Sequence, residues 1–140
     1  MRFVTSIEID ADVDRVWAVQ TDIDRWPEWT PSVRAARRGE DGPFTLGATA
    51  RLEQPRLRPA LWRVIEIDPP RFFAWESASP GVRSRGEHRI DPLPDGRVRV
   101  ELALVQTGPL AAAVGLLGGG TMRRYLRQET EGLKRRCERG

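Results

Sequence analysis

The feature that most constrains this chain is its final stretch, residues 107–138, which has the pattern of one long helix. Pro109 suits the first helical position, because a proline there loses no hydrogen bond, and Thr107 or Gly108 can cap it. Apolar residues recur at spacings of three and four, or sums of these, and predict one continuous stripe: Leu110, Val114, Leu117, Met122, Leu126, Leu133 and Cys137. A helix with such a stripe needs another layer of the fold to cover it.

The two halves of this predicted helix differ in composition. The first half is nearly uncharged and contains Gly118, Gly119 and Gly120 in succession, whereas arginines surround the stripe in the second half. Each glycine inside a helix costs about 1 kcal/mol relative to alanine, so helix stability alone does not account for the run. Two interpretations stay open: the helix breaks at this turn, or another backbone comes close to it there.

Before this helix, strand-like sequence recurs between short turns that contain Gly or Pro. Residues 3–10 alternate and predict a half-buried strand, and two short helices follow near residues 13–20 and 22–29. Six further strands are predicted at residues 33–38, 48–53, 61–67, 72–77, 83–91 and 97–106. The turns between them are too short for crossover helices, so the seven strands should form an antiparallel sheet.

The order of these elements predicts an α+β fold in one domain, residues 1–140. A strongly curved seven-stranded antiparallel sheet, wrapped around the long C-terminal helix, would bury both apolar faces. This arrangement is a helix-grip fold, with the two short helices placed after the first strand.

Composition restricts where the protein can act. The chain is 39% hydrophobic and 31% charged, which is typical of a soluble globular protein. The low-charge part of the predicted helix, residues 107–122, is shorter than the roughly 20 residues that span a bilayer, so no transmembrane segment is predicted. The first residues lead directly into strand-like sequence without the apolar core of a signal peptide, and a cytoplasmic location is therefore expected.

The residue inventory also restricts the chemistry. Cys137 and His88 are the only cysteine and histidine, so neither an internal disulfide nor a zinc site of clustered Cys and His ligands is expected. The glycine run lies within a helix and not between a strand and a helix, which disfavours a phosphate-binding loop. No metal or cofactor is predicted. Nucleic-acid binding is not expected either, because it would also need clustered aromatic residues among these arginines, and the arginine-rich half is better explained as a solvated face.

Several stretches resemble a known family when their order and spacing are taken together. They are residues 9–17 (IDADVDRVW), residues 22–29 (DIDRWPEW), residues 68–75 (DPPRFFAW), residues 86–90 (GEHRI) and the turn at residues 95–96. The whole chain is similar to the START-like, Bet v 1-like superfamily (SRPBCC), in particular to its polyketide cyclase/dehydrase-like proteins. The resemblance implies a helix-grip fold with a largely apolar cavity between the sheet and the C-terminal helix. Such folds include cyclases, aromatases, lipid carriers, quinone-binding proteins and co-chaperones.

His88 is the candidate catalytic residue. It shares strand parity with apolar Ile90 and should point inward, where an imidazole can act as a general acid or base or orient a carbonyl. The alternative is a core histidine that is hydrogen-bonded to a backbone group or to water.

A ligand site is predicted around His88 and beneath residues 110–125. Aromatic walls with a few polar groups are what pockets for flat or greasy molecules require. The candidate lining residues are Trp29, Trp62, Trp75, His88, Leu117, Thr121 and Tyr125. Ordinary packing of the core is the alternative for the aromatic residues.

The sequence therefore predicts a protein that binds a small hydrophobic molecule of polyketide, aromatic or lipid-like character. Whether it is an enzyme stays open. If it is one, the chemistry should be cyclisation or dehydration without a cofactor, with His88 as acid and base. The alternative is a non-catalytic hydrophobic-ligand carrier or a co-chaperone-like module that binds a partner protein. The sequence does not predict an oligomeric state.

Overall fold

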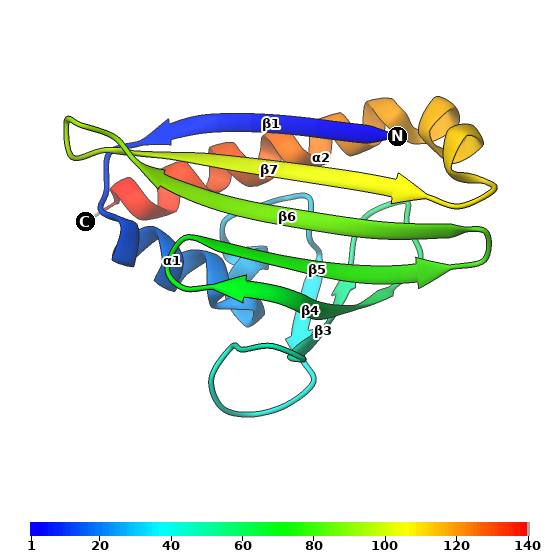
Figure 1. Ribbon diagram of the computed structural model, residues 1–140, viewed down its shortest axis with the longest axis horizontal. Helices are drawn as coiled ribbons and strands as arrows, with labels where there is room; N and C mark the ends of the chain where they lie inside the picture. Colours follow the sequence, from blue (N-terminus) through cyan, green and yellow to red (C-terminus); the bar gives the residue numbers. More distant parts are fainter. Residues whose placement is uncertain (140) are drawn as a thin grey trace.

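The computed structural model describes residues 1–139 and has the predicted order of elements (Figure 1). The strands are β1 (Arg2–Ile9), β2 (Ala35–Arg38), β3 (Thr49–Glu53), β4 (Ala60–Asp68), β5 (Phe72–Ser79), β6 (Val82–Pro92) and β7 (Val98–Thr107). The helices are α1 (Val13–Thr21), the 3-10 helix η1 (Ile23–Glu28) and α2 (Ala111–Glu138). The strands form one seven-stranded antiparallel sheet in the order β1-β7-β6-β5-β4-β3-β2.

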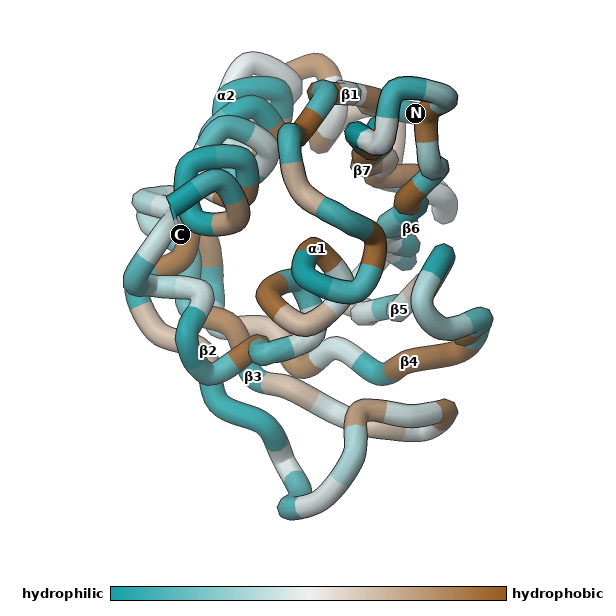
Figure 2. Tube along the Cα trace, turned by 90° about the vertical axis from the view of Figure 1, so that its left-hand side faces the viewer, coloured by the Kyte–Doolittle hydropathy of each residue, from teal (hydrophilic) through white to brown (hydrophobic). Residues whose placement is uncertain are grey.

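The sheet is strongly curved, as Figure 2 shows. It bends from β1 round to β2, with α1 inside the curve and α2 beside β1. The α+β helix-grip fold predicted from the sequence is thus confirmed. Within residues 1–139, no helix combines the length and apolar character that crossing a membrane requires.

Strand alternation correctly predicts which face of the sheet is buried. In β6, Gly86, His88 and Ile90 are buried, and in β7 so are Val98, Val100 and Leu102. Glu87 and Arg89 lie between the buried residues of β6 in the sequence and point to the opposite, convex face. The concave face therefore collects the apolar side chains that form the core.

The predicted stripe on α2 is wrong in its first half. The helix begins at Ala111 and not at Pro109, and its buried positions there are Ala111, Gly115 and Gly119. Leu117 is 88% exposed and lies on the opposite side of the helix. The reason is close packing against β1: a Cβ atom on Gly115 would meet Met1 at 2.6 Å, and one on Gly119 would touch Phe3 at 3.4 Å. Only small residues allow the helix to lie this near the strand.

The glycine run does not break the helix, which is continuous from Ala111 to Glu138. A Cβ atom on Gly118 or Gly120 would have no neighbour within 4 Å, so a close approach explains only Gly119. A tighter contact lies further along, at Gly132, where an added Cβ would overlap the backbone carbonyl of Trp29. The segment after η1 thus presses directly on the helix backbone.

Polar contacts fix the C-terminal end of α2 to the N-terminal part of the chain. The Arg15 guanidinium donates to the backbone carbonyls of Arg136 and Arg139, at 3.0 and 3.3 Å. Glu138 accepts from the backbone N–H of Asp10 at 2.8 Å, and this bond, with help from Lys134, lowers the pKa of the Glu138 carboxyl. These contacts hold the second half of α2 while its first half lies against β1.

Candidate functional site

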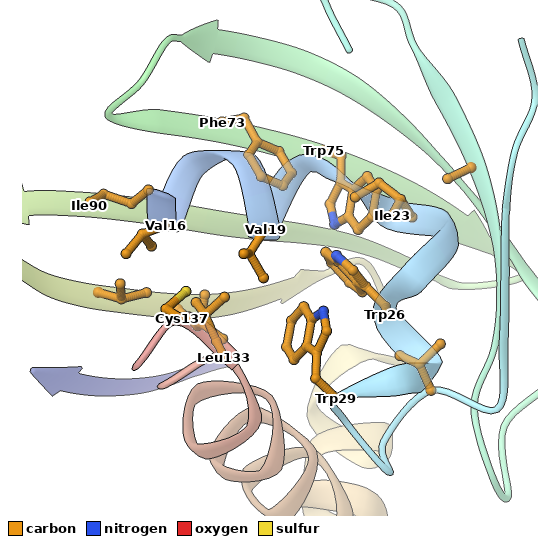
Figure 3. Close-up of a cluster of buried hydrophobic side chains, with 14 of the residues drawn as sticks. Val16, Val19, Ile23, Trp26, Trp29, Phe73, Trp75, Ile90, Leu133 and Cys137 are labelled. Atoms are coloured by element: carbon orange, nitrogen blue, oxygen red, sulfur yellow. The ribbon is translucent and has the colours of Figure 1, made fainter. Parts of the chain in front are cut away.

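A cluster of aromatic rings fills the concave side of the sheet next to α2 (Figure 3). The Trp26 ring lies 5.8 Å from that of Trp29 and 5.4 Å from that of Trp75, measured between centroids. Trp62 lies 5.6 Å from Trp75 on the neighbouring strand. We call Trp26, Trp29, Trp62, Trp75 and His88 the aromatic cluster; every member is buried.

Gly86 makes room for the aromatic cluster. It is the cross-strand neighbour of Trp75, and a Cβ at this position would meet Nε1 and Cδ1 of that indole at 3.0 and 3.1 Å. The ring of Trp62 would lie 3.7 Å away. Since β6 carries no side chain here, both indoles can approach the backbone of the strand closely.

His88 is surrounded by other aromatic rings. Its imidazole stacks on Phe73, with ring centroids 4.0 Å apart and an angle of 9° between the planes. Trp26 and Trp75 border it at 6.0 and 5.6 Å. The inward orientation predicted for His88 is present, while its role as a catalyst stays a prediction.

Glu129 of α2 faces His88 across the gap between helix and sheet. Its Oε2 lies 3.6 Å from Nε2 of His88, and the two side chains are only 12% and 6% exposed. The other ring nitrogen, Nδ1, is buried and has no hydrogen-bond partner among residues 1–139. If the proton of a neutral imidazole sits on Nε2 and faces the carboxylate, Nδ1 carries the lone pair. This pair can therefore present a proton acceptor to a bound molecule.

Two indole N–H groups of the aromatic cluster are also without a partner. Nε1 of Trp29 and Nε1 of Trp62 are buried and donate to no acceptor within residues 1–139. In contrast, Trp26 donates to the backbone carbonyl of Gln20 at 3.0 Å. Because an unmade buried hydrogen bond costs about 1 to 3 kcal/mol, unpaired donors of this kind call for an explanation. An oxygen acceptor on a ligand would satisfy them.

The remaining predicted lining residues are not all brought together. Tyr125 is buried, and its hydroxyl donates to the backbone carbonyl of Pro55, so it bridges α2 and the β3–β4 loop. Thr121 lies one turn earlier and is half-buried. Leu117, as described above, points to the surface, so we do not include it in the candidate site.

Two hollows formed by residues 1–139 differ from the predicted apolar cavity. One, of about 710 Å³, lies between η1 and strands β2–β4 and is lined mainly by charged side chains such as Arg37, Arg38 and Glu40. The other, of about 320 Å³, lies beside Trp29 and Gly132 and is bordered by arginines near the end of α2. His88, Trp62 and Trp75 line neither of them. The aromatic side chains themselves occupy the concave face.

Cys137 is not a candidate nucleophile. It is buried near the end of α2, and burial raises the pKa of its thiol to about 11 because the charged thiolate is poorly solvated there. Among residues 1–139, no three His, Cys, Asp or Glu side chains are grouped in a way that could hold a metal ion.

Sequence reasoning missed Glu129, although a signal was present. Glu129 follows Tyr125 by four residues and precedes Leu133 by four, so helical spacing puts a carboxylate on the buried face of α2. The close approach at Gly132 had no such signal, because it depends on where the segment after η1 crosses the helix.

Comparison with known proteins agrees with this architecture. A family model described as "Polyketide cyclase / dehydrase and lipid transport" matches residues 1–138. A hypothetical protein of Helicobacter pylori is similar in structure, with a TM-score of 0.85 and 15% identity over 99% of this chain and 88% of that one. The ZhuI aromatase/cyclase of Streptomyces sp. R1128 has a TM-score of 0.79 and 19% identity, over 99% and 94% of the two chains.

A START superfamily protein of Mycobacterium smegmatis is also similar, with a TM-score of 0.71 and 16% identity over 96% of this chain and 97% of that one. At sequence identities this low, similarity to a solved structure shows a shared fold and not a shared activity. The search of curated proteins found no match to this sequence.

Proposed function

The chain belongs to the polyketide cyclase / dehydrase and lipid transport family, and from this premise we propose that it binds a small, flat hydrophobic molecule in the aromatic cluster. Polyketide, aromatic or lipid-like compounds are the ligand class. The observation that carries the proposal is the pair of unpartnered indole N–H donors of Trp29 and Trp62, set among apolar rings. A flat apolar molecule with an oxygen acceptor would satisfy both the rings and the donors.

Side chains must move for such a ligand to enter. The rings of the aromatic cluster are in mutual contact distance, so a bound molecule has to replace part of that packing. The bridge from Tyr125 to Pro55 spans the open side between α2 and the β3–β4 loop. We infer that release of this bridge, together with rotation of Trp29 or Trp62, admits the ligand.

If the bound molecule reacts, His88 and Glu129 are the groups that support the chemistry. In a cyclisation followed by dehydration, Nδ1 of His88 would take a proton from a carbon next to a carbonyl group. That carbon would then attack a second carbonyl within the same molecule. The Glu129 carboxylate, 3.6 Å from Nε2, would stabilise the imidazolium formed. The imidazolium would return its proton to the alkoxide formed, which becomes a hydroxyl group. Nδ1 would then take the second proton from the same carbon and pass it to that hydroxyl group, which leaves as water while the carbon–carbon double bond forms, and no cofactor is needed.

A carrier without catalytic activity is the second candidate. The burial of His88 and its stacking on Phe73 favour it, because a histidine held in this way also serves the core. The same ligand site serves both functions, so ligand binding is common to them and only turnover separates them. A partner-binding module of the co-chaperone kind would not need the aromatic cluster to open.

Native mass spectrometry of the protein purified from its own host tests ligand binding. The expected result is a population with one small molecule per chain. Trp62→Phe removes one N–H donor and should reduce the retained fraction about fivefold, the effect of one neutral hydrogen bond. Trp17→Phe is the matched control, since Trp17 packs on the α1 side of Phe73, and should retain the molecule. Recovery of bare chain only, even after exposure to a lipid extract of the host, would contradict the proposal.

A further inference from the structure

The first half of α2 exposes two large apolar side chains on its outer side. Leu116 and Leu117 are 83% and 88% exposed, the highest values among the large hydrophobic residues of the described chain. Helical spacing places Leu117 opposite Gly115 and Gly119, which face β1, and Leu116 between the two sides. Figure 1 shows this part of α2 running past the start of β1, at the edge of the molecule. The two leucines take no part in the core or in the aromatic cluster.

The next two turns carry arginines on the same side of the helix. Arg124 and Arg127 are exposed, and helical spacing aligns them with Leu116 and Leu117. Arg123 is also exposed, but its guanidinium lies over the Phe3 ring, 5.1 Å from the centroid, and so turns toward β1. Within residues 1–139, none of the three lies within 4.0 Å of a carboxylate, whereas arginines elsewhere in the fold, such as Arg25, Arg85 and Arg97, do. Residues 102–128 contain no aspartate or glutamate at all.

We propose that this outer face of α2, defined by Leu116, Leu117, Arg124 and Arg127, binds the surface of a lipid bilayer that contains anionic lipids. The helix would lie in the plane of the interface, with both leucines among the upper acyl chains and the arginines at lipid phosphates. Amphipathic helices with apolar and basic residues bind membranes in this way, through buried apolar area together with attraction to anionic headgroups.

The charges on this face argue against a second copy of the chain as its occupant. Two outer faces in contact would bring arginines against a stretch with no carboxylate to pair with them. The leucines also protrude from the helix, and neither of the two hollows described above is lined by outer-face residues, which does not favour a shaped site for one partner protein. A fluid anionic surface fits both the protruding leucines and the unpaired arginines.

Membrane binding extends the proposed function without depending on it. A hydrophobic ligand partitions into bilayers, so contact with one would give the aromatic cluster a source or a destination for its ligand. Vesicle binding is measured on the protein with no ligand added. The ligand-retention experiment described above is done without vesicles. Failure of one proposal is therefore distinguishable from failure of the other.

Cosedimentation of the full chain with vesicles tests the proposal. We expect binding to vesicles of phosphatidylcholine with about 30% phosphatidylglycerol, little binding to pure phosphatidylcholine, and weaker binding as salt increases. Leu116→Ser with Leu117→Ser should lower the partition coefficient by roughly tenfold or more. Arg124→Gln with Arg127→Gln should lower it by roughly fivefold per charge.

Matched controls lie at the opposite edge of the sheet. Arg37→Gln with Arg51→Gln removes the same charge from exposed positions that make no ion pair among residues 1–139, and Leu46→Ser removes an exposed leucine that is 62% accessible. These variants should bind vesicles like the wild type. The proposal is overturned if the wild type binds neither vesicle, or if controls and outer-face variants lose binding equally. It is also overturned if the leucines instead hold a dimer together. Sedimentation equilibrium would then give twice the monomer mass for the wild type and the monomer mass for the Leu116→Ser, Leu117→Ser variant.

Discussion

At the scale of single residues, the nearness of His88 and Glu129 is the feature with the most chemical consequence. Two buried polar side chains lie 3.6 Å apart between apolar rings, and one nitrogen of the pair has no partner within residues 1–139. A core histidine of purely structural use would normally have its nitrogens satisfied by hydrogen bonds. The unpaired Nδ1 is therefore the atom on which the catalytic alternative depends.

We predict that Glu129→Gln separates the catalytic alternative from the structural one. If the protein is an enzyme, the loss of the carboxylate charge should lower turnover by roughly 100-fold, as for a disabled general acid or base, with little change in ligand affinity. If the pair is structural, ligand binding and any activity should follow the folded fraction alone. Turnover, ligand titration and a thermal melt on one variant decide between these outcomes.

Glu131→Gln is the matched control for that experiment. Glu131 lies on the exposed side of the same helix, two residues further on, and the substitution makes the same chemical change. Equal effects of the two variants on turnover would contradict a specific role for Glu129.

Cys137 gives a prediction about pH. Its thiol has an ordinary pKa of 9.0 when unfolded and a pKa of about 11 in the fold, because burial disfavours the thiolate. The contribution of this thiol to the free energy of unfolding is therefore fully present below pH 9. It falls as the pH rises from 9 toward 11, because in this range the thiol ionises in the unfolded chain and not in the folded one. The loss should total roughly 2 to 3 kcal/mol. Urea unfolding at pH 8 and pH 10.5 measures this loss. In the Cys137→Ala variant, the free energy of unfolding should decrease less between the two pH values. An equal decrease in the variant and the wild type would refute this explanation.

At the scale of elements, α2 shows both what sequence patterns predict and where they fail. The length of the helix, the seven strands and the inward side of β6 and β7 follow from periodicity, which depends only on local geometry. Periodicity misplaces the apolar stripe in the first half of α2 because it assigns the large apolar residues to the core. The distance between α2 and β1 instead requires Ala111, Gly115 and Gly119 there. Such a distance is a property of the assembled fold.

The same reasoning applies to the candidate site. Strand parity was enough to direct His88 inward, and the aromatic residues were recognisable as candidates from their type alone. Their mutual packing, and the partners that Trp29 and Trp62 lack, depend on how η1 crosses toward α2. Local patterns carry no information about that crossing, so neither feature was predictable.

The glycines of α2 provide a prediction at this scale. Gly132→Ala should destabilise the protein by about 1 to 3 kcal/mol, although alanine favours a helix, because its methyl group would overlap the Trp29 carbonyl. Gly118→Ala is the matched control, since nothing lies within 4 Å of that position, and should stabilise by up to about 1 kcal/mol. Chemical denaturation of both variants tests this, and a stabilising Gly132→Ala would show that the close contact is absent.

At the scale of the whole molecule, three parts of the surface of α2 have different roles. The second half of α2 is fixed to the N-terminal part of the chain by Arg15 and Glu138. Its inner side brings Glu129 to His88 and Tyr125 to the carbonyl of Pro55, and its outer face points to solvent. The fold therefore joins the proposed ligand site and the proposed membrane-binding face on opposite sides of a single element.

The central claim is that the aromatic cluster binds a ligand through the free N–H groups of Trp29 and Trp62. The most direct measurement is a ¹H–¹⁵N NMR titration that follows the indole N–H signals of the five tryptophans. The titrant is 2-acetylnaphthalene, a flat apolar molecule with one carbonyl acceptor, and naphthalene is the control without it. We predict that 2-acetylnaphthalene shifts the Trp29 or Trp62 signal downfield by hydrogen bonding, that naphthalene does not reproduce this downfield shift, and that Trp17 changes little. Identical responses to both compounds, or shifts confined to Trp17, would contradict the claim.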